Sequence, residues 1–520
     1  MPSSRDPVFL TYALARAGYG PAPGDIDKAA RQGWSGWVEE QLAPTADDPV
    51  LAPRLASTLL RIRHGGGDGW DAVDEMRPLE RLGKPIEALW PLADGKRKMD
   101  GAERRRPRDE VVAATLLAAV HSRWQLKELI TAFWHDHFNV DFYGSDTLAA
   151  TLPVYDREVI RAHALGNFRQ FLEAVATSAA MLTYLSNRSS RAGAANENYA
   201  RELFELHTLG RDAYLNDRYD RWRAVPGALS GQPEGYIDQD VYEAARALTG
   251  WSLEDGAGID GRRKLPESGR FAYVESWHDG YQKRVLATEF QPFAAAMADG
   301  RQVLDLVAAH PATARHLAGK LCQRLVGGRP PRLVAAAAAE WSRQAKAPDQ
   351  IARVVRLILL SPEFAAARGA KVRRPLAVAA GFARAAGIDL LPTEGLVNAI
   401  AGAGQRLFGW PTPTGLPDED SQFLGAQALR QRWALTLGLA ENWWGCGNPT
   451  PPAAATFGQA VSAWQIMLLG APDPEAGNAI LAGLGWSADQ SPGRPGMPDT
   501  ARKLNRLAAL TAMAPAFHQI

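Results

Sequence analysis

The chain has 520 residues, of which 46% are hydrophobic and 22% are charged, and these ordinary globular values exclude a disordered or fibrous protein. A chain of this length buries roughly three-quarters of the surface that its unfolded form exposes, so it needs neither disulfide bonds nor a structural metal for bulk stability. Its 58 basic and 57 acidic residues leave a formal charge of +1, which gives no general electrostatic reason to bind nucleic acid or anionic lipid.

No stretch reaches the roughly 18 apolar residues of a membrane span, and the N-terminus lacks the apolar core of a signal peptide. We therefore expect a soluble protein with no membrane span and no nucleic-acid partner. The compartment stays open. The chain is cytoplasmic by default, and it is exported if it is a trimmed mature form or is carried by a partner.

The predicted elements are almost all helical. A short helix is expected over Asp25–Gly33, with Asp25 as the N-cap. A long core helix is expected over Glu110–Phe138, where apolar residues recur at helical spacing. Residues 154–186 and 196–210 predict further helices, separated by a loop rich in Ser, Arg and Gly.

Two segments, residues 211–235 and 254–270, are rich in Arg, Asp, Gly and Pro and are expected to form surface insertions. Between them lies a predicted helix, in which Asp240 as N-cap and Glu243 at the third helical position fit a capping box. Residues 271–290 are expected to form a small β-hairpin.

The second half of the chain predicts Ala-, Leu- and Arg-rich helices, with Pro-rich breaks at residues 411–420 and 446–455. We therefore predict a mainly α, multi-helix globular fold, and the absence of a fixed-period repeat argues against an α-solenoid. Its three parts are a helical domain with the candidate site, a helical continuation packed on that domain, and a C-terminal helical tail, over residues 1–300, 301–445 and 446–520.

The chain has two cysteines, Cys322 in a predicted helix and Cys446 in a predicted loop. One disulfide bond is possible, but the spacing does not establish it. Two isolated cysteines do not form a zinc site.

The densest group of metal-capable side chains is His135, Asp136 and His137, at the end of the long predicted helix. Residues two apart do not share a helix face, so both imidazoles reach one ion only if the helix ends here. Glu128 lies seven residues before His135, on the same face. In the alternative interpretation, each histidine satisfies a buried carbonyl or caps the helix end. Both interpretations stay open.

The segment NENYARELFELHTLG supplies a second group of metal-capable side chains, namely Glu197, Glu202, Glu205 and His207. Tyr199 lies among the apolar residues between them. Carboxylates combined with imidazole are typical of zinc, iron or manganese sites, although the Glu-x-x-His signature of di-iron bundles is absent. The alternative is a solvated helix face with ion pairs, begun by Asn196 as the N-cap.

Four further side chains are candidates for the chemistry of a site. Arg246 either pairs with Glu243 or anchors an anionic substrate, and Trp251 follows the end of the same predicted helix. His278 and Asp279 reach into a cavity edged by the insertions, or they form an ordinary Asp-Gly turn. No phosphate-binding G-x-x-x-x-G-K-[ST] motif and no G-x-S-x-G nucleophile motif is present.

The chain contains, in order, the blocks FWHDHFNV, ENYARELFELHTLG, DVYEAARALTGW, WHDGYQK, HPATARHLAGKLCQRL, VRRPLAVAAG and GWPTPTGLPDED. These blocks resemble a bacterial family catalogued as domain-of-unknown-function family 1800. The resemblance implies a large helical fold and frequent export. It also implies a frequent gene neighbour of a sulfatase-like or alkaline-phosphatase-like family, but no established reaction. This chain departs from the family pattern in having no export leader.

These features lead to two hypotheses. In the first, the protein is a metal-dependent enzyme whose divalent ion (Zn, Fe, Cu or Mn) is held by His135, His137 and carboxylates of the 197–207 helix. His278 or Asp279 then closes the pocket, and an oxidoreductase is slightly favoured over a hydrolase because Trp134, Tyr199 and Trp251 are candidate redox-active aromatics. In the second, the chain is a non-catalytic binding or assembly subunit, working with a sulfatase- or phosphatase-like partner or a carbohydrate.

Overall fold

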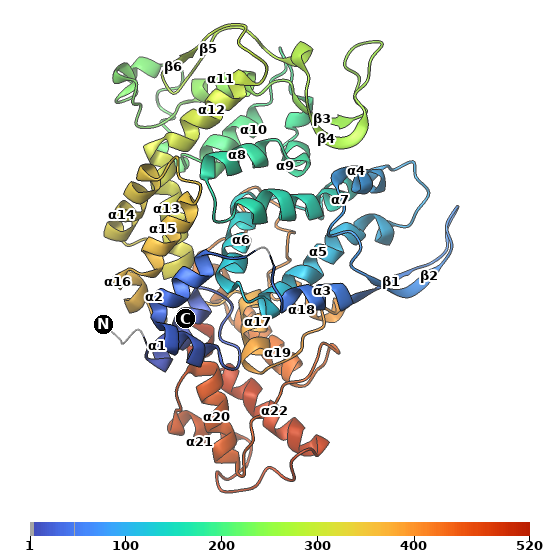
Figure 1. Ribbon diagram of the computed structural model, residues 1–520, viewed down its shortest axis with the longest axis vertical. Coiled ribbons are helices and arrows are strands. Elements are labelled where there is room, and N and C mark those ends of the chain that lie inside the picture. Colours follow the sequence, from blue (N-terminus) through green and yellow to red (C-terminus); the bar gives the residue numbers. More distant parts are fainter. Residues whose placement is uncertain (1–4, 46) are drawn as a thin grey trace.

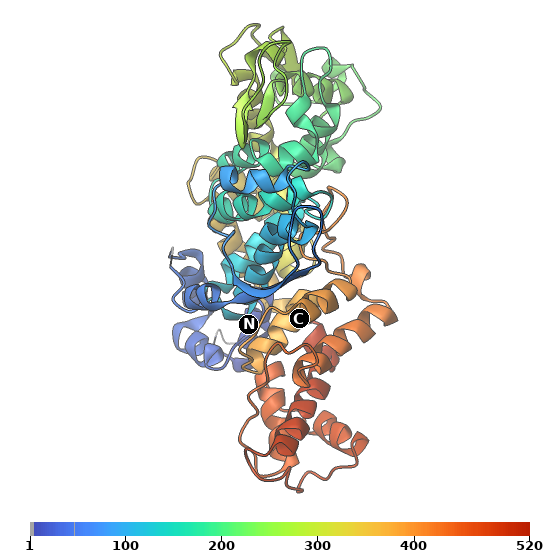
Figure 2. The ribbon, with the colours of Figure 1, turned by 90° about the vertical axis from the view of Figure 1, so that its right-hand side faces the viewer.

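The computed structural model describes residues 5–45 and 47–520, and it is mainly α-helical, as the sequence predicts. Figures 1 and 2 show an elongated molecule, with the segment around residues 190–300 at one end and residues 457–512 at the other. The strands of the described residues form three separate two-stranded antiparallel sheets. The mainly α fold class is therefore confirmed.

The first part of the chain is formed by α1 (Pro7–Arg16), α2 (Asp25–Leu42), α3 (Leu51–Ser57), β1 (Leu59–His64), β2 (Val73–Pro78), α4 (Ile86–Leu89), η1 (Trp90–Ala93), α5 (Gly101–His121) and α6 (Gln125–His137). It continues through α7 (Asp146–Val154), the π-helix η2 (Tyr155–Arg161), α8 (Phe168–Ala176), α9 (Ala179–Tyr184), η3 (Asn187–Ser189), α10 (Glu197–Glu202) and the π-helix η4 (Leu203–His207).

The middle part comprises η5 (Arg211–Ala213), η6 (Trp222–Ala224), η7 (Ala228–Ser230), α11 (Asp238–Ala247), β3 (Trp251–Asp255), β4 (Glu267–Tyr273), η8 (Glu275–Trp277), β5 (Lys283–Val285), β6 (Thr288–Phe290), α12 (Ala298–Ala309) and α13 (Pro311–Val326). The last part comprises α14 (Pro331–Arg343), α15 (Gln350–Leu359), α16 (Pro362–Ala366), α17 (Pro375–Ala385), α18 (Glu394–Gly402), η9 (Asp420–Phe423), α19 (Ala426–Ala440), α20 (Phe457–Leu469), α21 (Pro474–Gly483), α22 (Pro498–Ala512) and α23 (Pro515–His518).

Two large groups of buried apolar side chains form the core. One extends from α1 to α16 and includes the aromatic residues around Trp134 of α6, and the other joins α17 to α23. Helix α5 contributes to both, because Val111 belongs to the first group whereas Leu116 and Val120 belong to the second. The predicted C-terminal tail therefore shares a buried core with α5.

The prediction of one long helix over Glu110–Phe138 is wrong, because the helix is interrupted between α5 and α6. The carboxylate of Asp48 accepts a hydrogen bond from the Ser122 hydroxyl at 2.8 Å and another from the amide of Arg123 at 2.9 Å. The Ser122 hydroxyl in turn accepts from the amide of Trp124. These bonds satisfy backbone groups outside a helix, so α6 begins in a new direction.

The prediction that the first helix ends at Gly33 is also wrong. Helix α2 continues to Leu42 through a kink at Gly33, whose φ of 73° suits glycine. Asp25 is the first helical residue, preceded by the N-cap Gly24. The helix resumes because Trp34 and Trp37 stack on each other and are buried in the core.

The predicted hairpin over residues 271–290 has different partners. Strand β4 pairs with the preceding strand β3, so the 254–270 insertion is part of this hairpin. Strand β5 pairs with β6. Leu286 and Ala287, which connect β5 and β6, both have positive φ, as a two-residue turn of this hand requires. The β1–β2 hairpin lies outside the strands that the sequence predicts.

The expected capping box of α11 is shifted along the chain. Asp240 is not the N-cap but the third helical residue, and one of its carboxylate oxygens accepts from the amide of the N-cap Ile237 at 3.0 Å. The other oxygen accepts from the amide of Leu286 at 2.7 Å. Glu243 instead pairs with Arg246 at 2.6 Å.

Both cysteines are buried and free. Within the part of the chain that the structure describes, no helix is long and apolar enough to cross a bilayer.

Candidate active site

The end of α6 carries three consecutive polar residues that point to different surroundings. His135 and Asp136 line a cavity of about 90 Å³. Side chains of α5, η2, α13 and residues 405–416 form other parts of its wall. His137 does not line this cavity and is buried, with 1% of its surface exposed. The structure therefore separates the two histidines, as expected for residues two apart on a helix.

His135 is held by a chain of charged side chains. Its Nε2 lies 2.8 Å from Oδ1 of Asp156, whose Oδ2 accepts a hydrogen bond from Nε of Arg161 at 2.8 Å. Arg161 also donates to Glu128 at 2.7 Å. Burial raises the pKa of the Asp156 carboxyl, but the Arg161 guanidinium and the His135 imidazole outweigh burial and lower it to about 2.

The π-helix η2 explains how Asp156 and Arg161 reach the same cavity wall. The two residues are five apart, a spacing that an α-helix places on different faces and that the wider i→i+5 turns of a π-helix align. Because Asp156 is ionised, its carboxylate accepts a hydrogen bond from Nε2–H of His135, and in the neutral imidazole this leaves Nδ1 as the unprotonated nitrogen. A carboxylate that fixes a histidine tautomer in this way prepares the imidazole to act as a base.

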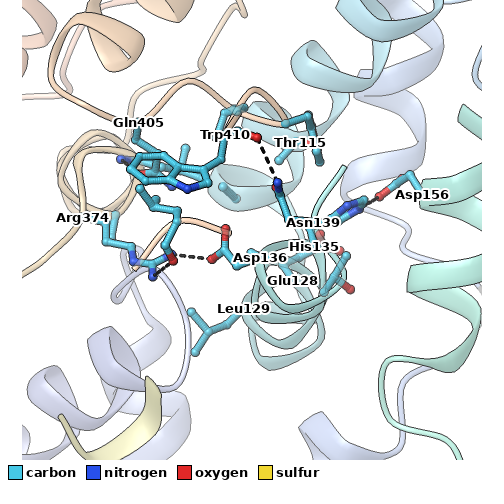
Figure 3. A pocket seen from close by; sticks show the side chains of 18 of the residues that line it. Thr115, Glu128, Leu129, His135, Asp136, Asn139, Asp156, Arg374, Gln405 and Trp410 are labelled. Atoms are coloured by element: carbon cyan, nitrogen blue, oxygen red, sulfur yellow. Dashed lines mark hydrogen bonds and ion pairs between the residues drawn. The ribbon is translucent and has the colours of Figure 1, made fainter. Parts of the chain in front are cut away.

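A second ion-pair network forms the opposite wall. The Asp136 carboxylate accepts from Arg324 of α13 and from Arg374, which precedes α17, each at 2.5 Å. Asp418 pairs with both arginines and with Lys371, and these cations hold the pKa of Asp418 far below its usual range although burial opposes this. Figure 3 shows Asp136 and Arg374 on one side and His135 with Asp156 on the other.

Three buried polar atoms in the cavity walls lack a hydrogen-bond partner among the described residues. They are the hydroxyls of Thr115 and Thr131 and the Nε of Arg374. A buried polar group without a partner costs about 1–3 kcal/mol. These atoms therefore indicate that the cavity accommodates water or a polar ligand.

Residues 405–418, here called the covering segment, close one side of the cavity. The side-chain amide of Asn139 donates to the backbone carbonyl of Trp410 (Figure 3) and to that of Thr412. The amide of Phe142 donates to the carbonyl of Phe408. Gly415 has a φ of 72°, and a Cβ there would lie 1.8 Å from the carbonyl oxygen of Asp136. Only glycine allows the covering segment to approach α6 so closely.

A buried cationic and imidazole cluster lies behind the cavity. The Nζ of Lys320 is 2.9 Å from Nδ1 of His137, and the His137 ring centroid lies 6.2 Å from that of His207 and 6.3 Å from that of His316. Burial lowers the pKa of Lys320 to about 8 and that of His207 to about 3. Neither ring nitrogen of His207 has a partner among the described residues.

The sequence-predicted carboxylates of α10 and η4 do not join this arrangement. Glu197 is exposed, and neither Glu202 nor Glu205 lines the cavity. Glu205 pairs with Arg211, and burial raises the pKa of Glu202. Asn196 is the N-cap of α10, as predicted, because its side chain accepts from the amide of Tyr199.

The other predicted site residues lie outside the cavity. Arg246 forms a bidentate ion pair with Asp279, in which Nε donates to Oδ2 at 2.8 Å and Nη2 donates to Oδ1 at 3.1 Å. The Nε2 of His278 lies 3.3 Å from Asp299. Tyr199 and Trp251 are fully buried core residues.

Several residues of the site were not singled out in the sequence, namely the cavity residues Asp156, Arg161, Arg324 and Arg374, and Asp418 behind them. One signal was present: His316, Lys320 and Arg324 follow at intervals of four on α13 and so share one face of the helix. Asp156 and Arg161 gave no such signal, because their spacing aligns only in a π-helix.

The described residues include no preformed set of ligands for the predicted metal ion. In residues 5–45 and 47–520, no three or more His, Cys, Asp and Glu side chains are arranged to hold an ion. Arginines already engage Asp136 and Asp156, so the cavity side chains as they stand do not fit a metal.

Comparison with known proteins identifies one family. A family model described as "Protein of unknown function (DUF1800)" matches residues 12–519, nearly the whole chain. No curated protein and no solved structure matches the chain.

We predict that Gly415→Ala destabilises the protein much more than Gly404→Ala. Both glycines have positive φ, so each alanine costs about 1–3 kcal/mol of backbone strain, but no atom lies within 4 Å of a Cβ at position 404. At position 415 overpacking against Asp136 adds roughly another 1–3 kcal/mol. Urea unfolding of both variants measures the difference, and equal destabilisation would contradict the close packing of the covering segment.

We predict that the ion pairs of Asp156 stabilise the fold above about pH 4 and lose this effect in acid. The pKa of Asp156 is depressed in the folded protein, so the contribution is complete above the unfolded pKa and is lost as the pH falls toward 2. The difference in unfolding free energy between wild type and Asp156→Asn is about 2 kcal/mol at neutral pH and about half of that at pH 3.

Urea unfolding between pH 7 and pH 3 measures this difference. Asp68→Asn, at an exposed side chain that pairs with Lys98, is the control and shows little change at any pH. A difference for Asp156→Asn that stays constant down to pH 3 would show that Asp156 is not part of a charged network.

Proposed function

Because the chain belongs to the DUF1800 family, whose description names no function, we propose a function from the chemistry of the cavity. The protein is an enzyme that acts on a small polar molecule, with His135 as the general base and Asp156 as the residue that orients it. The observation that carries this proposal is the 2.8 Å contact between His135 and Asp156 in the wall of a cavity with unpartnered polar atoms.

The groups in the cavity walls have complementary tasks in such a reaction. The Nδ1 of His135 removes a proton from water or from a substrate hydroxyl, and Asp156 stabilises the imidazolium that results. The guanidinium of Arg374, on the opposite wall, stabilises negative charge that develops on the substrate. The covering segment limits the access of bulk water and so strengthens these interactions.

This chemistry favours a hydrolase over the oxidoreductase that the sequence slightly favours. A histidine oriented by a carboxylate activates water directly, whereas the three aromatic residues behind the redox hypothesis do not surround the cavity. Trp134, Tyr199 and Trp251 are each at most 1% exposed, and none of them lines it. The substrate and any sulfatase- or phosphatase-like partner stay proposals.

A metal-dependent enzyme is the second candidate. It is favoured by the contact between His137 and His207, two predicted ligands, and by the unpartnered nitrogens of His207. Neutral imidazole is a metal ligand, and burial lowers the pKa of both histidines. A metal would require these side chains to rearrange.

We predict for the hydrolase that His135→Gln lowers kcat at least 100-fold, since general acid–base catalysis contributes about 10²–10⁴-fold. Hydrolysis of a panel of small esters, lactones and amides, followed by proton NMR, provides the measurement. His163→Gln is the matched control, because His163 bonds the carbonyl of Val159 outside the cavity, and it keeps the wild-type rate.

A His135→Gln variant with wild-type kcat would refute the role of His135. If no compound in the panel reacts with wild-type protein, the non-catalytic binding subunit becomes the better account.

For the metal-dependent candidate we predict stoichiometric Zn, Fe, Cu or Mn in the purified protein, lost in His137→Gln and in His207→Gln. Elemental analysis with parallel melting temperatures separates loss of metal from loss of fold. Glu197→Gln, at an exposed side chain, keeps its metal. Wild-type protein that stays metal-free after incubation with each of these ions would reject this candidate.

A further inference from the structure

The charges that line the cavity do not cancel. Its walls contain four arginines and three carboxylates, which leaves one cation in excess. Three of the arginines, Arg161, Arg324 and Arg374, are bonded to carboxylates of the cavity. The side chain of the fourth, Arg406, forms no ion pair or hydrogen bond with the described residues. The Lys371 and Asp418 pair behind the wall adds no net charge.

The Arg406 side chain packs against Tyr143 and has no ion-pair partner among the described residues. Its guanidinium lies 5.1 Å from the centroid of the Tyr143 ring, and Gly409 packs against both side chains, since a Cβ there would lie within 2.8 Å of each. The side chain is exposed at the side of the cavity. An oriented guanidinium with free N–H groups matches the two oxygens of a carboxylate.

The remaining surface of the cavity is mostly apolar. Leu129, Leu376, Leu407, Phe408 and Trp410 contribute to its walls, and they offer a hydrophobic surface to a short carbon skeleton. The unpartnered hydroxyls of Thr115 and Thr131 can bond a polar group on that skeleton.

We infer that the cavity binds a small organic molecule through a single carboxylate group, with Arg406 as the anchor. This inference rests on the proposed function, because it names the substrate class of the same cavity. One excess cation is balanced by one negative charge, so a monocarboxylate fits the wall charges better than a phosphate dianion. The rest of the molecule lies along the apolar wall, toward Nδ1 of His135.

Ligand-observed NMR titration tests this inference with propionate and butyrate against their neutral amides, propionamide and butyramide, at constant ionic strength. We expect wild-type protein to bind each carboxylate at least tenfold more tightly than the amide of the same shape. Arg406→Met loses at least tenfold in carboxylate affinity, and Arg406→Lys recovers part of it because the charge is kept.

Arg430→Met is the matched control, because Arg430 is an exposed arginine of α19 that bonds Gln427 and does not line the cavity. It binds carboxylates as the wild type does. Equal binding of carboxylate and amide, an Arg406→Met affinity equal to that of wild type, or tighter binding of inorganic phosphate than of butyrate would each overturn the inference.

The His135→Gln variant distinguishes this inference from the proposed function. If His135→Gln and wild type both bind butyrate and react with the panel at equal rates, the substrate class holds and the catalytic role of His135 fails. If His135→Gln abolishes hydrolysis while Arg406→Met changes neither binding nor rate, the proposed function holds and the carboxylate anchor fails.

Discussion

The cavity depends on the ion pairs that the Asp136 carboxylate forms with two arginines. The carboxylate accepts hydrogen bonds from Arg324 and Arg374, and so it joins α6 to α13 and to the start of α17. The same arginines hold Asp418 and thereby the end of the covering segment. Arg324 and Arg374 are buried, and a buried charge is tolerated only when it is paired, so that removing its partner typically costs about 3–5 kcal/mol. The geometry around His135 therefore rests on a network that does not easily reorganise.

Backbone irregularities then place the chemistry around this network. The interruption after Ser122 sets the direction of α6, the π-helix η2 turns Asp156 and Arg161 to one side, and Gly415 allows the covering segment to lie against α6. Strained or unusual backbone is often concentrated at functional sites. Of these, η2 contributes Asp156 and Arg161 to the cavity wall, and Gly415 precedes Leu416, which also lines the cavity. This supports the assignment of the cavity as the site.

The sequence predicted the helical class, and it singled out the end of α6, where His135 and Asp136 line the cavity. Composition, apolar spacing and three adjacent polar residues are local signals. The sequence did not predict which side chains meet at the end of α6. Asp156 and Arg161 align only through a π-helix, and Arg374 and Asp418 come from segments over 230 residues distant in the chain. Glu197 and Glu205 are carboxylates of the kind that bind metal ions, but Glu197 is exposed to solvent and Glu205 pairs with Arg211.

The central claim is that Asp156 fixes the tautomer of His135 and leaves Nδ1 as the base. Long-range ¹H–¹⁵N NMR of histidine-labelled protein at neutral pH tests it most directly, with His135 assigned by the signals lost in His135→Gln. The account predicts that Nε2 of His135 carries the proton and Nδ1 does not. A proton on Nδ1 with Nε2 free would contradict it, because Asp156 would then face an unprotonated nitrogen.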